Sequence, residues 1–280
     1  MLQHLLSLAE RCIHVADVGA AFLGEAASYQ ILIDQSLCTL SAFEPDAREI
    51  DALRQRLGEF ATVFPDALGD GHEHTLYVCR KGLGMNSLLE PDSSMLGFFN
   101  LFPEWGRVEG TERITTRRLD DIDEIPPIDF LKMDVQGSEL SILINGRTKL
   151  ARCIAVETEV SFITLYKNQP TFGDIDRELR RQGLIPHRFT AIKKWSISPT
   201  IRSGEPPYPF HQLLEADIVY IRDIIHPEAI DNEQIAKLAV LGHLVFDSPD
   251  LTVRCLLELQ QRKAVEPNAA DRYLECLAEV

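Results

Sequence analysis

The chain has 280 residues, of which 45% are hydrophobic and 25% are charged, and these proportions are typical of a globular protein rather than a disordered or membrane-embedded one. The formal net charge of −15 repels phosphate backbones, so we expect no nucleic-acid partner. The sequence shows no signal peptide and no apolar run of the ~20 residues that cross a bilayer, which predicts a cytoplasmic protein with no membrane partner.

Apolar periodicity predicts alternating helices and strands along the chain. A helix is expected over residues 2–9, and the first strand follows over 13–18. Further strands are expected over 37–43, 61–64, 75–79, 128–133, 153–156, 185–196 and 213–222. Further helices are expected over 47–57, 138–144, 172–181, 235–242, 251–262 and 271–277. Two segments rich in Gly, Pro, Ser and aromatic residues, 81–106 and 198–210, are expected to be loops.

Strands that alternate with helices predict an α/β fold, in which a mostly parallel sheet is covered by helices on both faces. We expect one domain over residues 1–226 and a helical extension over 227–280 that packs on it. Ligands of such sheets bind at the carboxyl ends of the strands. The residues that follow each predicted strand are therefore the first candidates for chemistry.

The first two predicted strands end in residues that suit a ligand. The first ends in Asp17-Val18-Gly19-Ala20, where the glycine lets the backbone approach a ligand closely. The carboxylate of Asp17 can accept hydrogen bonds from the loop or from a ligand ammonium. Glu44, which precedes Pro45 at the end of the second strand, can accept hydrogen bonds from both hydroxyls of a ribose. Its alternative role is that of a charge at a helix start.

Two further strand ends carry polar residues. Asp66 and Ala67 follow the third strand, where a polar group can meet an adenine amino group or simply make a turn. The clearest buried strand ends at Asp134-Val135-Gln136-Gly137-Ser138. Gly137 permits a sharp turn, and Ser138 can cap the helix that follows.

The segment from Ile128 to Glu139, IDFLKMDVQGSE, resembles the signature of FkbM-type methyltransferases. Supporting pieces follow the family's order, namely DVGA at 17–20, FEP at 43–45, LDDI at 119–122 and the stretch from 157 to 183. The resemblance covers roughly residues 13 to 185. The chain departs from the family after Ala20, where relatives have Asn and this chain has Ala21, with Gly24 nearby.

The resemblance implies a Rossmann-like class I methyltransferase fold and S-adenosyl-L-methionine as the cofactor. The residues implied to bind this cofactor are Asp17, Gly19, Ala20, Glu44, Pro45, Asp66, Ala67, Asp134, Val135 and Gln136. It also implies methyl transfer to an oxygen, for which the candidate catalytic carboxylates are Asp134 and Glu157. Either can take the proton of the acceptor or orient its hydroxyl. Alternatively, Asp134 only supports the cofactor and Glu157 is a structural partner of Lys132.

The expected acceptor is a small molecule or a glycan-like compound with a hydroxyl group. The two loops offer aromatic faces and hydrogen-bonding groups that suit a hydroxylated ring, at Asn86, Ser87, Phe98, Phe99, Trp105, Trp195 and Tyr208. The alternative is that these aromatic residues only anchor the loops on the core. A homodimer through the 172–181 helix and the C-terminal helices is a further expectation.

Three other functions compete with this interpretation. A nicotinamide-dependent oxidoreductase needs G-x-G-x-x-G after the first strand, and Gly19 and Gly24 do not give that spacing. A non-catalytic binding module can keep the fold without the chemistry. A metal-assisted methyltransferase needs further ligands beside Asp134, and no adjacent Asp-Asn pair completes such a site. The six scattered cysteines form no CxxC pair and no cluster with zinc-site spacing. We therefore expect no metal.

Overall fold

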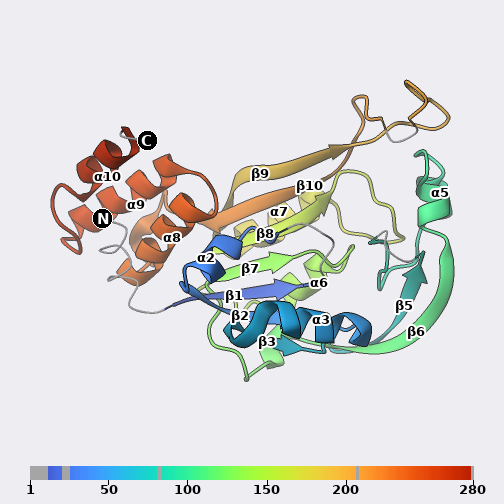
Figure 1. Cartoon of the computed structure of the whole chain (residues 1–280), viewed down its shortest axis with the longest axis horizontal. Helices are drawn as coiled ribbons and strands as arrows, with labels where there is room; N and C mark the ends of the chain where they lie inside the picture. The colour runs from blue at the N-terminus through green and yellow to red at the C-terminus, as the bar shows by residue number, and fades with distance from the viewer. Residues whose placement is uncertain (1–11, 21–25, 81–83, 206–207, 279–280) are drawn as a thin grey trace.

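The computed structural model describes residues 12–20, 26–80, 84–205 and 208–278. The helix predicted over 2–9 and the departure from the family at Ala21 and Gly24 lie outside the described residues. The described chain is built around a seven-stranded sheet in the order β3-β2-β1-β7-β8-β10-β9. Its strands are β1 (Ile13–Val18), β2 (Cys38–Phe43), β3 (Ala61–Phe64), β7 (Phe130–Met133), β8 (Ala155–Ser161), β9 (Leu184–Lys194) and β10 (Leu213–Arg222), as Figure 1 shows.

The direction of the strands confirms the predicted mostly parallel sheet. β3, β2, β1, β7 and β8 run parallel to one another, whereas β10 is antiparallel to both β8 and β9. β9 and β10 are joined by residues 195–212, whose described part contains no helix, whereas the crossovers between consecutive parallel strands carry helices. The carboxyl ends of the five parallel strands therefore meet at one edge of the sheet.

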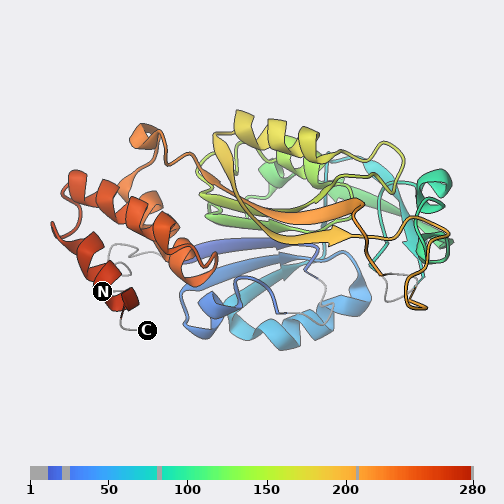
Figure 2. The ribbon, with the colours of Figure 1, turned by 90° about the horizontal axis from the view of Figure 1, so that it is seen from above.

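Helices cover both faces of this sheet. Successive side chains of a strand point to opposite faces, so each face has its own set of buried apolar residues. One face buries Ala16, Leu131 and Val156 against α6 (Glu139–Ile144) and α7 (Phe172–Arg181). The other face packs against α2 (Gln30–Asp34), α3 (Ala47–Leu57) and the C-terminal helices α8 (Asn232–Leu244), α9 (Pro249–Gln261) and α10 (Ala269–Ala278). Figure 2 shows α7 and α3 on opposite sides of the sheet.

The C-terminal helices pack at the amino ends of the parallel strands (Figure 1). α8 begins with a capping box, in which Gln234 N donates to Asp231 Oδ1 at 2.9 Å and the Gln234 side chain accepts from Asp231 N. The Nζ of Lys237 lies 2.7 Å from Oδ2 of Asp129, just before β7, and both side chains are largely buried. The domain boundary predicted at residue 227 stays a prediction. Because the C-terminal helices lie at the amino ends of the parallel strands, they do not cover the carboxyl edge of the sheet.

A second, three-stranded sheet has the order β4-β6-β5 and consists of β4 (Ala67–Leu68), β5 (Glu73–Cys79) and β6 (Val108–Arg117). The prediction missed β6 because most of its residues are polar or exposed, so its sequence lacks an apolar period. The 81–106 segment, predicted as one loop, contains the short helices α4 (Ser93–Leu96) and α5 (Phe102–Trp105). Short 3-10 turns cover Gly58–Phe60, Leu119–Asp121 and Pro227–Ala229.

Membrane spans and metal sites were both expected to be absent, and the described residues give the following picture. None of the helices described is both long and apolar enough to cross a membrane. Within the same residues, His, Cys, Asp and Glu side chains nowhere gather in groups of three or more that would suit a metal ion.

Candidate active site

The ends of β1, β2 and β7 meet at the carboxyl edge of the main sheet. The backbone N–H groups of Gly19 and Ala20 donate to the Phe43 carbonyl at 3.1 and 3.2 Å, directly before Glu44. Asp134 N donates to the Val18 carbonyl at 3.0 Å. The structure thus brings the turns that contain Gly19, Glu44 and Asp134 together at one edge, as the sequence predicts.

Gly19 is required by this close approach. Its φ is +80°, and a Cβ built on its backbone would lie 2.1 Å from the carbonyl oxygen of Asp134. A side chain is therefore excluded both by backbone conformation and by contact with the neighbouring turn. The absence of a side chain at Gly19 is what lets the turns after β1 and β7 pack this closely.

Asp17 lies on β1 two residues before Gly19 and is almost fully buried. Its Oδ2 accepts a hydrogen bond from the Tyr29 hydroxyl at 2.5 Å, whereas its Oδ1 has no hydrogen-bond partner among the described residues. The Nζ of Lys132 lies 3.6 Å from that Oδ1, which is an ion-pair distance but too long for a hydrogen bond. Buried carboxylate oxygens are normally hydrogen-bonded, so this oxygen fits a donor group of a bound ligand, such as an ammonium.

The second strand ends at Glu44, whose side chain is also buried. One of its carboxylate oxygens accepts a hydrogen bond from Asp46 N at 2.8 Å, across the exposed Pro45. This bond holds the carboxylate at the carboxyl edge, where α3 begins. The position is compatible with both roles considered for Glu44, since a carboxylate has two oxygens and several acceptor sites.

Asp66 lies between β3 and the small sheet, and Ala67 begins β4 of that sheet. Ala67 pairs with Thr116 of β6. The Oδ2 of Asp66 accepts from Arg117 Nη1 at 3.2 Å. This ion pair gives Asp66 a structural partner, and its contact with an adenine stays a prediction.

The turn from Asp134 to Gly137 is held by a residue that the sequence analysis did not assign. The buried carboxylate of Glu139 accepts hydrogen bonds from the backbone N–H groups of Val135, at 3.1 Å, and of Gly137, at 3.0 Å. Burial raises the pKa of Glu139 to about 7, against the lowering effect of these bonds. The prediction that Ser138 caps α6 is wrong, because its side chain makes no cap hydrogen bond; Glu139 satisfies the free N–H groups of the turn instead.

The prediction that Glu157 ends a strand is also wrong. β8 continues to Ser161 because it pairs with the antiparallel β10 beyond the point where β7 ends. Glu157 is the register partner of Lys132, and its buried carboxylate accepts hydrogen bonds from the hydroxyls of Ser28, at 2.5 Å, and Thr190, at 3.5 Å. Lys132 keeps its charge: burial lowers its pKa, but the nearby carboxylates of Asp17, Asp134 and Glu157 raise it above the ordinary value.

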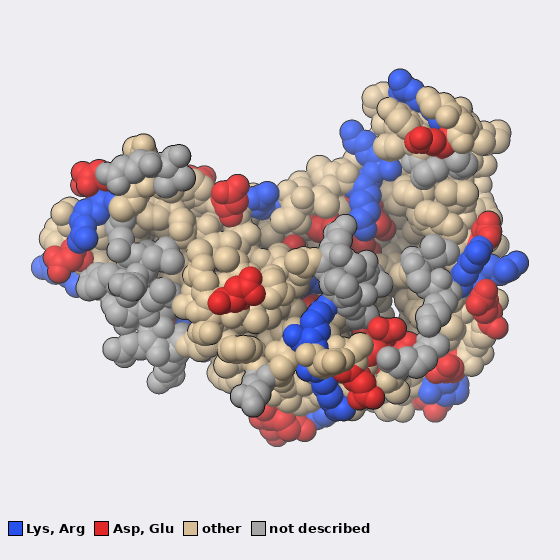
Figure 3. All heavy atoms as spheres, in the orientation of Figure 1, with Lys and Arg blue, Asp and Glu red and all other residues tan. Residues whose placement is uncertain are grey.

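Further charged residues on β8, β9 and β10 extend this polar region. The Nζ of Lys193 lies 3.3 Å from Oε2 of Glu159 and 2.7 Å from Oε1 of Glu215. Asp217 is the register partner of Glu159. The acidic residues at alternate positions of otherwise apolar strands were the signal for this region, which the sequence analysis missed. Figure 3 shows basic and acidic side chains side by side over the ends of β9 and β10.

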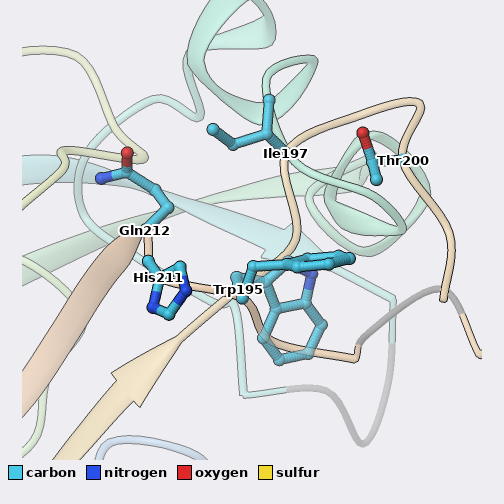
Figure 4. Close-up of a pocket in the computed structure, with 6 residues that line it drawn as sticks. Trp195, Ile197, Thr200, His211 and Gln212 are labelled. Atoms are coloured by element: carbon cyan, nitrogen blue, oxygen red, sulfur yellow. The ribbon is translucent and has the colours of Figure 1, made fainter.

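A separate hollow of about 370 Å³ lies in the connection between β9 and β10. It is lined by Trp195, Ile197, Thr200, Phe210, His211 and Gln212, which Figure 4 draws as sticks with all but Phe210 labelled. None of these residues belongs to the predicted cofactor set, so the hollow is distinct from the Gly19–Asp134 edge. Among the predicted loop residues, Phe99 is fully buried and Trp105 packs on Trp195, which makes them loop anchors. Phe98 and Tyr208 are exposed.

Comparison with known proteins identifies relatives of the chain. The model of the methyltransferase FkbM domain matches residues 17–185. The chain is 28% identical over 142 residues to the 2-O-methyltransferase NoeI of Sinorhizobium fredii, and this match covers 46% of the chain and 56% of that protein. The chain thus spans little more than half the length of this curated relative.

Two solved structures are similar at lower identity. Methyltransferase FkbM from Methylobacillus flagellatus is 16% identical with a TM-score of 0.42, over 75% of this chain and 43% of that one. Magnesium protoporphyrin IX methyltransferase from Synechocystis is 10% identical with a TM-score of 0.39, over 79% of each chain.

The family match confirms the predicted resemblance and extends over more than half of the chain. It favours neither an oxidoreductase nor a binding module. The observed strand order, with one antiparallel strand in a parallel sheet, agrees with the predicted class I methyltransferase fold. The chain therefore belongs to the FkbM family of S-adenosylmethionine-dependent methyltransferases.

Proposed function

We propose that this chain transfers a methyl group from S-adenosyl-L-methionine to a hydroxyl oxygen of a small-molecule or glycan-like acceptor. The observation that carries the proposal is the meeting of the Gly19, Glu44 and Asp134 turns at one carboxyl edge, inside the family-matched segment. The name of the relative NoeI, a 2-O-methyltransferase, supports oxygen as the methylated atom.

The residues at this edge suit the cofactor. When bound, S-adenosylmethionine supplies a methyl group activated by a sulfonium. Gly19 and Ala20 form the turn after β1 that packs on the Asp134 turn, and Asp17 offers its Oδ1, which lacks a hydrogen bond from any described residue, to the cofactor's ammonium. Glu44 is assigned to the ribose hydroxyls, with Pro45 beside it. The cofactor site also includes Asp66 and Ala67, and Asp134 with Val135 and Gln136, as the family resemblance implies.

Asp134 and Glu157 are proposed to orient the acceptor hydroxyl beside the cofactor. Holding the acceptor oxygen near attack distance and in line with the transferred methyl supplies much of the catalysis in such a displacement. Glu157 does this through a carboxylate fixed by the Ser28 hydroxyl. Its register pairing with Lys132 gives it a structural role as well.

The role of Glu44 is tested by replacing it with alanine. We expect the affinity for S-adenosylhomocysteine to fall about tenfold to hundredfold, because two hydrogen bonds to a charged acceptor are lost. Isothermal titration calorimetry measures this affinity, and circular dichroism checks that the variant stays folded.

The matched control is Glu49→Ala, which removes an acidic residue from the first turn of α3. It should leave the affinity unchanged. If Glu44→Ala behaves like the control, Glu44 is only a charge at the helix start and the ribose assignment fails.

Acceptor recognition is proposed to involve the connection between β9 and β10. The rings of Tyr208 and Phe210 lie 6.4 Å apart, and the Arg202 guanidinium lies 4.9 Å from the Tyr208 ring centre. Exposed aromatic faces beside cationic and hydrogen-bonding groups suit the apolar faces and hydroxyls of a sugar ring.

Phe210→Ala is expected to raise the KM for a sugar acceptor about threefold to tenfold, the range of one aromatic contact. The affinity for S-adenosylhomocysteine should not change, because Phe210 lies outside the cofactor edge. Ile225→Ala, at an exposed apolar residue after β10, serves as the control. An unaltered KM in Phe210→Ala would assign the acceptor to another surface.

The cellular setting completes the proposal. All six cysteines lie within the described residues and are unpaired, which is compatible with the reducing cytoplasm. We propose a cytoplasmic location, and a homodimer remains the proposed assembly. Size-exclusion chromatography with light scattering measures the mass in solution.

A further inference from the structure

One face of the main sheet carries a row of charged side chains at its carboxyl half. Strand register places Asp17 beside Lys132 and Lys132 beside Glu157. Glu157 pairs with Val219, and Glu159 pairs with Asp217. Directly opposed residues point to the same face, so these side chains share one face, and the amino half of that face is packed against α8 and its neighbours. The row begins at the proposed cofactor edge with Asp17, whose buried Oδ1 accepts no hydrogen bond from any described residue.

Most carboxylates in this region already accept hydrogen bonds from protein groups. These bonds run from Tyr29 to Asp17, from Gln136 to Asp134 and Glu159, from Ser28 and Thr190 to Glu157, and from Lys193 to Glu159 and Glu215. Each of these carboxylates is held in place by at least one protein donor, which suits a positioning role.

Asp217 differs from its neighbours. Its backbone oxygen accepts a hydrogen bond from the Thr190 hydroxyl, but its carboxylate accepts none from any described residue. The side chain is half-buried, which leaves it reachable from solvent. Burial raises the pKa of Asp217 to about 6, since the favourable charge of Lys193 is opposed by Asp134, Glu157 and Glu215. Asp217 is therefore ionised at neutral pH and more basic than an ordinary aspartate, which suits a general base.

We infer that Asp217 is the general base of the reaction and takes the proton of the acceptor hydroxyl. This inference rests on the proposed function. As the acceptor oxygen forms its bond to the methyl carbon, the carbon–sulfur bond breaks and its electron pair stays on sulfur. The hydroxyl proton passes to the Asp217 carboxylate and is then released to water. Lys193 donates to Glu159 and Glu215, whereas the Asp217 carboxylate accepts no hydrogen bond from any described residue.

The test compares Asp217→Asn with the intact chain, using methyl-labelled S-adenosylmethionine and a panel of neutral mono- and oligosaccharides. Loss of a general base should lower kcat/KM about 10²-fold to 10⁴-fold. The affinity for S-adenosylhomocysteine, measured by calorimetry, should stay within twofold. In the intact chain kcat/KM should fall as the pH drops below about 6, and this acid limb should be absent from the residual activity of Asp217→Asn.

The pH dependence of the melting temperature checks that the Asp217→Asn variant is folded. Because the pKa of Asp217 is raised in the folded state, ionisation at that site destabilises the fold above pH 6. Asp217→Asn should therefore melt at or above the temperature of the intact chain at pH 7.5, and the difference should vanish below the ordinary aspartate pKa. Asp223→Asn, just beyond the other end of β10, is the matched control and should keep full activity.

Several results would overturn the inference. Asp217→Asn with kcat/KM within threefold of the intact chain would do so, as would an acid limb that persists in that variant. A ¹³C NMR titration, which needs no acceptor, would also overturn the inference if the Asp217 carboxyl resonance titrated at the ordinary aspartate value. If the intact chain methylates no member of the saccharide panel, the proposed function fails and the inference fails with it. If the intact chain is active but Asp217→Asn or the titration gives one of the results above, the inference fails and the proposed function stands.

Discussion

Replacing Gly19 with alanine is expected to abolish measurable binding of S-adenosylhomocysteine. The new Cβ would lie 2.1 Å from the Asp134 carbonyl oxygen and 3.0 Å from its carbon, both backbone atoms that cannot rotate away. The turn after β1 would have to separate from the turn after β7, which opens the edge where the cofactor residues meet. The φ of +80° adds a conformational cost of about 1–2 kcal/mol for any residue with a side chain. Calorimetric titration and thermal melting measure the two effects.

Gly58→Ala separates close approach from backbone strain. Gly58 has a φ of +60°, but a Cβ there would meet no atom within 4 Å. This variant should lose about 1 kcal/mol of stability and bind S-adenosylhomocysteine normally. If Gly19→Ala also binds normally, the contact between the turns after β1 and β7 does not shape the cofactor site, and the proposed function loses its main support.

The elements that could be predicted from the sequence are those whose burial follows a simple pattern. Every residue of β1 is buried and four of its six residues are apolar, so this strand could be predicted, and β2, β3, α3 and α7 have nearly the predicted bounds. The turns after β1, β2 and β7 were also found, because a glycine or an acidic residue directly after a buried strand stands out from the apolar run before it. The predicted cofactor residues depend on these local signals.

The parts that could not be predicted depend on pairing between distant segments. β6 is stabilised by β5 and β4 rather than by apolar burial, so its own residues carry no period. The length of β8 is set by β10, which lies more than 50 residues later in the chain. The place of Asp217 beside Glu159 depends on this pairing, and its sequence neighbours give no sign of it. A single sequence shows which residues are polar, but not which of them lack a partner.

The second large effect is expected at the other end of the sheet, for Lys237→Met. Methionine keeps much of the apolar stem of Lys237 but removes the ammonium that lies 2.7 Å from Asp129 Oδ2 and 3.2 Å from Glu233 Oε1. The side chains of Lys237 and Asp129 are only 7% and 14% exposed. Removing one partner of a buried ion pair leaves the other charge uncompensated, at a cost of about 3–5 kcal/mol. Urea unfolding at pH 7.5 measures the loss.

Two further variants determine whether this loss comes from the stranded charge. Asp129→Asn in the Lys237→Met background should recover part of the stability, because the amide can still accept the hydrogen bond that His14 N donates to Asp129 Oδ2 without carrying a charge. Lys167→Met removes an ammonium that pairs with Glu90 on the surface, where both side chains are about half exposed, and should leave the urea midpoint unchanged. Equal losses for Lys237→Met and Lys167→Met would mean that α8 is held on the sheet by its apolar contacts alone. A larger loss for Lys237→Met, relieved by Asp129→Asn, would make the ion pair the polar link between the C-terminal helices and the start of β7.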